Sequence, residues 1–110
     1  MLPKNNRIPR KMFPLLNSGA KFYQSDIFLF KYLEKKDNKR FCFSISKKVA
    51  KKAVLRNRLR RWGYDGVRTY LEGIKNNVII LFVYKKIPKN KDEVLENIKY
   101  LLNKNKLITK

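Results

Sequence analysis

The segment from Ser46 to Arg61 constrains this chain more than any other part of the sequence. Eight of its sixteen residues are lysine or arginine, and none is acidic. A solvated tail would carry such charge without pattern, but here Leu55, Leu59 and Trp62 recur at i, i+4 and i+7. The spacing predicts a helix that docks on a core through this apolar stripe, with Arg58 at the stripe's edge. The side chains expected to point to solvent are Arg56, Asn57, Arg60 and Arg61.

Guanidinium groups on a rigid helix suit the planar, bidentate recognition of phosphate. The whole chain has 28 basic and 8 acidic residues, a net charge of +20 that makes a compact fold repel itself. A polyanionic partner explains this charge, with nucleic acid the first candidate and an anionic membrane the second. We see no apolar run near the roughly 18 residues of a membrane span and no cleavable signal pattern. We therefore expect a soluble, cytoplasmic protein without a membrane partner.

The sequence offers little for catalysis. It has no histidine, the commonest general base, and its carboxylates show no spacing for a metal clamp or an acid–base pair. The single Cys42 lies in an alternating apolar segment, where a small buried thiol is expected. One cysteine without histidine builds neither an internal disulfide nor a zinc site. We expect no catalytic residue and no metal ligand in this chain.

At 110 residues the chain is long enough for one domain and not for two. The predicted element order is αβββαβα, an α+β sandwich of helices on a small sheet, with flexible basic ends at 1–8 and 104–110. Residues 35–39 are predicted to form a hairpin turn, and Gly63 and Gly66 to end or kink the basic helix. The other elements expected are a first helix from Pro9 to Leu16, strands at 21–23, 27–33, 41–45 and 78–84, a basic helix capped by Ser46, and a last helix behind an Asn90–Glu93 capping box.

The stretch from Phe43 to Arg61 resembles the protein subunit of bacterial ribonuclease P. The shared pattern is Ser-Lys-Lys, an Ala-Val pair, and Arg-Asn-Arg followed by an apolar residue and two basic ones. The order of elements agrees as well, so the resemblance covers roughly residues 7 to 105. It implies a small mixed sheet with a left-handed βαβ crossover around the basic helix. It also implies a ribonucleoprotein that removes the 5′ leader of precursor tRNA, in which the RNA and its Mg²⁺ carry the chemistry and the protein alone binds no cofactor.

The resemblance further implies two partners, the catalytic ribonuclease P RNA and precursor tRNA, and no obligate protein partner. A leader-binding cleft would lie between the sheet and the first helix, formed by Phe13 (or Met12 in its place), Phe30, Ser44 and Lys48. Tyr64 stands where the family usually has a further arginine. The residues expected against the catalytic RNA are Lys47, Lys48, Lys51, Lys52, Arg56, Asn57, Arg58, Arg60 and Arg61.

The alternative is a ribosome-associated or general RNA-binding protein without a nuclease role. Such a protein would show the same charge and the same abundance of aromatic residues but not this motif. A DNA-binding module ranks third, because no dimer element or helix-turn-helix partner accompanies the basic helix.

Overall fold

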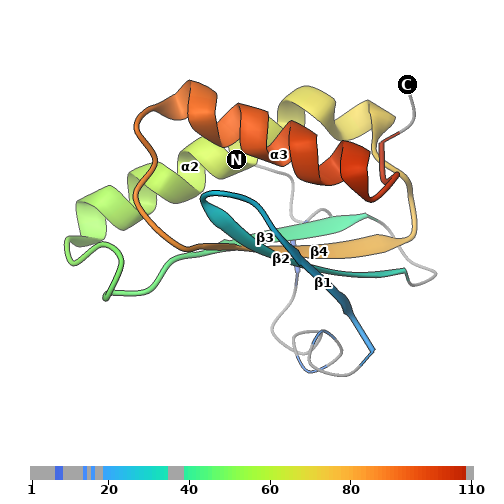
Figure 1. The fold of residues 1–110 in the computed structure, drawn as a ribbon, viewed down its shortest axis with the longest axis horizontal. Coiled ribbons are helices and arrows are strands. Elements are labelled where there is room, and N and C mark those ends of the chain that lie inside the picture. The colour runs from blue at the N-terminus through green and yellow to red at the C-terminus, as the bar shows by residue number, and fades with distance from the viewer. Residues whose placement is uncertain (1–6, 9–13, 15, 17–18, 35–38, 109–110) are drawn as a thin grey trace.

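The computed structural model of the chain describes residues 7–8, 14, 16, 19–34 and 39–108. Within these residues, four strands form a mixed sheet in the order β1-β2-β4-β3. The helices α2 and α3 lie together over one face of this sheet (Figure 1). The α+β prediction is thereby confirmed, and the first helix predicted over 9–16 falls largely outside the described residues. The elements are β1 (Lys21–Gln24), β2 (Phe28–Glu34), β3 (Arg40–Ser44), α2 (Ala53–Tyr70), the 3₁₀ turn η3 (Leu71–Gly73), β4 (Val78–Tyr84) and α3 (Lys91–Lys104).

The strand β4 is antiparallel to β2 and parallel to β3. Its continuous apolar run predicted a central strand, and the strand order confirms that position. It separates β2 from β3, so residues 35–39 join two strands that are not neighbours, and the predicted hairpin there is wrong. Parallel neighbours need a crossover connection, and α2 with η3 supplies it between β3 and β4. The residues before α2 therefore emerge at the end of β3, at one end of the sheet.

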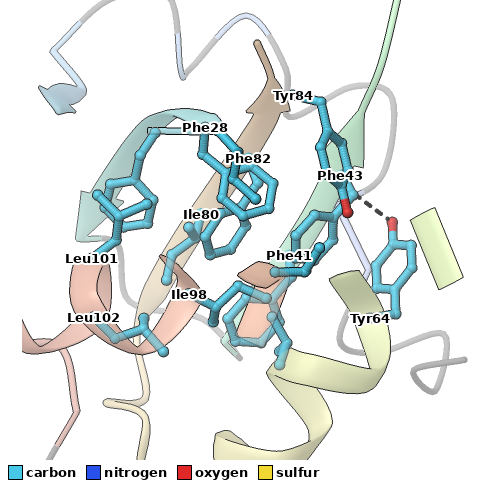
Figure 2. Packing of buried hydrophobic residues seen from close by; sticks show 14 of the residues in the cluster. Phe28, Phe41, Phe43, Tyr64, Ile80, Phe82, Tyr84, Ile98, Leu101 and Leu102 are labelled. Atoms are coloured by element: carbon cyan, nitrogen blue, oxygen red, sulfur yellow. Dashed lines mark hydrogen bonds between the residues drawn. The ribbon is translucent and has the colours of Figure 1, made fainter. Parts of the chain in front are cut away.

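The core fills the space between the sheet and the two helices (Figure 2). Alternate residues of β2, β3 and β4 face it, because side chains of a strand point to opposite sides in turn. The rings of Phe43 and Phe82 stack with centroids 4.5 Å apart, and Phe28 meets Phe82 edge-on at 5.2 Å. Tyr84 is buried among them, and its hydroxyl donates a 2.6 Å hydrogen bond to the carbonyl of Leu59. Burial raises the pKa of this phenol well above its usual range.

The helix α2 runs unbroken through both glycines, so the predicted end or kink is wrong. A Cβ at Gly63 would overlap the ring of Phe43, and a Cβ at Gly66 would lie 2.7 Å from Cδ1 of Ile98. The glycines therefore mark the places where α2 approaches β3 and α3 most closely. Glycine disfavours a helix by about 1 kcal/mol relative to alanine, and close packing of the helix offsets this at both positions.

The two helices begin differently. Asn90 caps α3 as predicted, because its Oδ1 accepts a 2.9 Å hydrogen bond from the Glu93 N–H. The basic helix begins at Ala53 and not after Ser46. Ser46 instead closes a turn, since its carbonyl accepts hydrogen bonds from the N–H groups of Val49 and Ala50. The lysines that precede α2 consequently lie in a loop.

The described residues near both termini are docked. Leu107 is buried and exchanges backbone hydrogen bonds with Leu102 and Lys75, so the predicted flexible tail is wrong for 104–108. Ile8 is buried too, and its N–H donates a 3.2 Å hydrogen bond to the carbonyl of Phe41. The prediction of a flexible N-terminal arm is therefore wrong for residues 7–8, while 1–6 and 109–110 lie outside the described part.

Candidate nucleic-acid interface

The residues predicted to contact RNA gather on the loop after β3 and on the first half of α2. We call this set the basic surface. Within it Arg58 is exposed, whereas Arg56 and Arg60 are half-buried beside the buried Leu59. The prediction that Arg58 sits at the edge of the apolar stripe is therefore wrong. The basic surface comprises Lys47, Lys48, Lys51, Lys52, Arg56, Asn57, Arg58, Arg60 and Arg61.

Two arginines of the basic surface are held in place by hydrogen bonds. Nη1 of Arg56 donates to the carbonyls of Ala50 at 2.9 Å and Lys51 at 2.7 Å. Arg56 thus fastens the lysine-bearing loop to the start of α2. Arg60 donates from Nη2 to Oδ1 of Asn57 one turn earlier. Side chains fixed in this way lose less conformational entropy on binding.

The positive charge of the basic surface has no acidic neighbour in sequence. The first turn of α2 holds no acidic residue, and within the described part of the chain no side chain caps its N-terminus. The helix dipole adds further positive charge there. The acidic residue of α2, Asp65, pairs with Arg68 at 3.0 Å and with Lys91 at 3.2 Å, which ties α2 to α3. An anionic partner is the natural complement of such a surface.

The sheet face opposite the helices carries a second candidate site. Near β3 it is covered, because Ile8 and Leu16 pack with Ile79. Beyond this cover the strand register aligns two rows of exposed and half-buried residues, in which Phe22 lies beside Lys31, and Leu29 beside Val83. Phe22 is 53 % exposed. We call these residues the open strip: Phe22, Gln24, Leu29, Lys31, Val83 and Ser44.

The open strip and the basic surface are continuous. Ser44 pairs with Val83 in the register of β3 and β4 and is the last residue of β3. Three residues later the exposed Lys47 and Lys48 begin the basic surface. A single RNA strand lying on the strip would therefore meet a lysine-rich loop at its end.

Phe30, predicted to stack on a leader base, is wrongly placed by the sequence argument. It is completely buried on the helix-covered face, where its ring contacts Phe82 at 5.1 Å. A ring without exposed surface cannot stack on a base. Ser44 and Lys48 are exposed as a binding role requires. Phe13 and its alternative Met12 lie outside the described residues.

Two residues of the open strip, Phe22 and Lys31, were missed by the sequence argument. The sequence did contain a signal for Lys31. It lies between two aromatic residues of the strand, and a charged residue that alternates with aromatic ones indicates the face toward solvent. Phe22 carried no such signal, since its neighbour Tyr23 offered an equally suitable ring. The register between β1 and β2 decides between them.

Tyr64, which replaces an arginine of the family pattern, has a structural position. Its ring meets that of Phe43 edge-on at 5.1 Å, and its hydroxyl accepts a 3.4 Å hydrogen bond from the Phe43 N–H (Figure 2). Burial raises the pKa of Tyr64, and it also raises the pKa of the nearby Cys42 thiol. Tyr64 therefore satisfies a backbone donor of β3 and presents no charge to a partner.

Among the described residues, no group of three or more histidine, cysteine or acidic side chains could hold a metal ion. No helix in that part of the chain is long and apolar enough to cross a membrane.

A basic surface that forms no ion pair with a described acidic side chain, next to an open sheet face bearing an aromatic ring, defines a structured nucleic-acid-binding protein. Comparison with known families narrows the class, because the family model described as Ribonuclease P matches residues 2–106. The chain belongs to the Ribonuclease P protein family. This confirms the resemblance inferred from the basic block and gives no support to the ribosome-associated alternative.

Relatives and solved structures agree with this assignment. The ribonuclease P protein component of Prochlorococcus marinus is 32 % identical over 120 residues, covering 93 % of this chain and 94 % of the relative. That of Rippkaea orientalis is 36 % identical, covering 97 % and 91 %. The RNase P protein of Staphylococcus aureus has a TM-score of 0.84 at 21 % identity, over 96 % of this chain and all of the other. That of Thermotoga maritima has a TM-score of 0.79 at 23 % identity, over 89 % and 96 %. At these identities the solved structures show a common fold.

Proposed function

We propose that this chain is the protein component of a cytoplasmic ribonuclease P that removes the 5′ leader of precursor tRNA. Its basic surface binds the catalytic RNA, and its open strip holds the leader. The observation that carries this assignment is the continuity of the two surfaces between Ser44 and Lys48. One small protein can thereby contact a folded RNA and a single strand at the same time.

The open strip has the chemistry of a single-strand site. Single-stranded RNA is bound by stacking its bases on aromatic side chains and by pairing its phosphates with cations. Phe22 offers an exposed ring, and the basic residue Lys31 is its register partner on β2. Such contacts tolerate many base sequences, as a leader that differs between tRNAs requires.

The chemical step belongs to the RNA and its Mg²⁺ in this proposal. Mg²⁺ takes oxygen ligands and is commonly bound through phosphates. The RNA phosphates would therefore hold the ion. The protein contributes affinity, by placing cations and one aromatic ring against the two RNA molecules.

Reconstitution tests the proposal. The chain is added to a bacterial ribonuclease P RNA at limiting Mg²⁺, and cleavage of a precursor tRNA with a labelled leader is followed. We expect faster cleavage and tighter binding of precursor than of mature tRNA. Protein without RNA should cleave nothing. If a ribonuclease P protein of known activity stimulates the same RNA and this chain does not, the proposal fails.

A double variant separates assembly from general charge effects. Arg60→Gln with Arg61→Gln removes two cations from the basic surface, whereas Lys99→Gln with Lys104→Gln removes two from α3. The first should weaken binding to the catalytic RNA far more than the second. Equal losses would show that total charge, and not the basic surface, binds the RNA.

A further inference from the structure

A pocket of about 440 Å³ lies between the N-terminal segment and α2. Arg7 lines one side, and Asn57, Arg60, Arg61 and Tyr64 line the other. Arg7 belongs to no motif of the sequence, and the pocket places it next to the basic surface. It sits along the free edge of β3, where Arg7 forms a bridge with Phe41.

The charges in this pocket are unbalanced. Three guanidinium groups line it, and none of the described residues around it carries a carboxylate. Nε of Arg7 is buried and, among the buried side-chain nitrogens and oxygens of the described residues, it is the one that lacks a hydrogen-bond partner. A buried charged donor without an acceptor is strongly unfavourable, and like charges in one pocket add to this. An anion between the three arginines would remove both penalties.

We propose that this pocket binds one phosphate group of an RNA backbone, with Arg7, Arg60 and Arg61 as its ligands. A phosphodiester has two non-bridging oxygens that accept paired hydrogen bonds from guanidinium forks. Asn57 accepts from Arg60 through Oδ1, which directs the guanidinium of Arg60 and leaves the amide NH₂ of Asn57 able to donate. The identification of this RNA as the catalytic RNA rests on the proposed function. The binding of phosphate by the pocket does not depend on it.

A phosphate in this position would connect the two surfaces of the protein. Arg7 is followed by Ile8, which is buried with Leu16 on the far side of the sheet and borders the open strip. The carbonyl of Arg7 also accepts a 3.0 Å hydrogen bond from Nη1 of Arg40. Holding Arg7 against α2 would therefore fix the segment that borders the leader site. Binding of the catalytic RNA would then favour binding of the leader.

Titration of the free protein with inorganic phosphate tests the pocket chemistry, followed by NMR of the arginine Nε–H groups. We expect the resonances of Arg7, Arg60 and Arg61 to shift along one common curve. Arg7→Met keeps the aliphatic stem and removes the guanidinium. It should raise the dissociation constant for phosphate about tenfold, the effect of losing one charge-assisted hydrogen bond. Lys99→Met on α3 is the matched control and should leave the curve unchanged. Absent shifts at the three arginines, or an Arg7→Met curve equal to the parent's, would overturn the proposal.

Binding measurements with RNA identify the source of the phosphate. Arg7→Met should weaken binding to the catalytic RNA about tenfold and lower the salt slope by about one unit, as one lost phosphate contact predicts. An effect confined to precursor tRNA with a leader, absent with mature tRNA, would assign the phosphate to the leader. Titration by phosphate without an effect on either RNA would show an adventitious ion only and overturn the RNA site. Circular dichroism checks that the Arg7→Met protein is folded. Arg7→Lys keeps the positive charge and serves as a second variant if Arg7→Met misfolds. If the parent chain itself failed to bind the catalytic RNA, the proposed function would fail while the phosphate titration stayed readable.

Discussion

Adjacent residues of β2 have opposite surroundings, since Phe30 lies in the core and Lys31 in the open strip. Alternation along a strand predicts that the two face opposite ways, and it likewise places Cys42 and Ser44 on the face away from Phe43. It could not predict which face the helices cover. That choice depends on where α2 and α3 pack, which involves residues far away in sequence.

The open strip makes separable predictions for neighbouring side chains. Phe22→Ala should weaken binding of long-leader precursor by the roughly 1–3 kcal/mol of a base–aromatic stack and leave mature tRNA binding and stability unchanged. Phe30→Ala should instead lower the free energy of unfolding by about 3–5 kcal/mol, as loss of a buried ring does. Urea unfolding and filter binding of both variants check this. A stable Phe30→Ala protein with a leader defect would reverse our assignment of the two rings.

Tyr84 predicts a pH dependence of stability. Burial raises the pKa of its phenol in the folded state, so the folded chain keeps the proton that the unfolded chain loses near pH 10. The stabilisation by Tyr84 is therefore complete below about pH 10 and declines above it. Tyr84→Phe removes the hydrogen bond to Leu59 and should destabilise the protein by about 1 kcal/mol at neutral pH. This deficit should shrink when unfolding is measured at about pH 11, and a deficit that grows there would contradict the assignment.

At the scale of elements, some features of α2 could be predicted from its sequence and others could not. Its basic half and apolar stripe follow from spacing, and the Asn90 cap of α3 follows from local chemistry. The continuity of α2 through Gly63 and Gly66 does not, because a glycine that breaks a helix and one that admits a neighbour have the same local sequence. The contacts with Phe43 and Ile98 decide the matter.

Alanine at the two glycines should test these contacts. Gly63→Ala places a methyl group in the ring of Phe43, and we expect a loss of about 1–3 kcal/mol in the free energy of unfolding. Gly66→Ala should be milder, because Cδ1 of Ile98 is the end of a flexible side chain, and Ile98→Val should restore part of the loss. Chemical denaturation measures all three. A gain of about 1 kcal/mol for Gly63→Ala, as helix propensity alone predicts, would show that the contact is absent.

For the whole molecule, net charge identified the class of partner, and a shared motif identified the family. Neither could show that the basic surface adjoins the open strip, which results from the order β1-β2-β4-β3 and from β3 ending beside the lysine loop. The contribution of Arg7 to the pocket could not be predicted either, because a single arginine in a basic segment forms no spacing pattern.

The charge of the whole molecule makes the assembly sensitive to salt. Each phosphate neutralised by the protein releases counterions, so affinity for the catalytic RNA should fall linearly on logarithmic axes as salt increases. Arg61→Gln should flatten this dependence by about one unit, whereas Lys99→Gln should leave it unchanged. Binding isotherms over a salt series measure both slopes. An unchanged slope for Arg61→Gln would place Arg61 away from the phosphates.

The position of Tyr64 has a consequence for the protein before it meets any RNA. β3 is an outer strand of the sheet, and unpaired backbone groups on an outer strand invite pairing with a second chain. The Tyr64 hydroxyl and the Ile8 N–H occupy such groups at Phe43 and Phe41. A side chain without a hydrogen-bond acceptor at this position would leave the Phe43 N–H open to pairing with a second copy of the chain. Tyr64 thus disfavours edge-to-edge association of free chains, and it does so without adding to the 28 positively charged side chains.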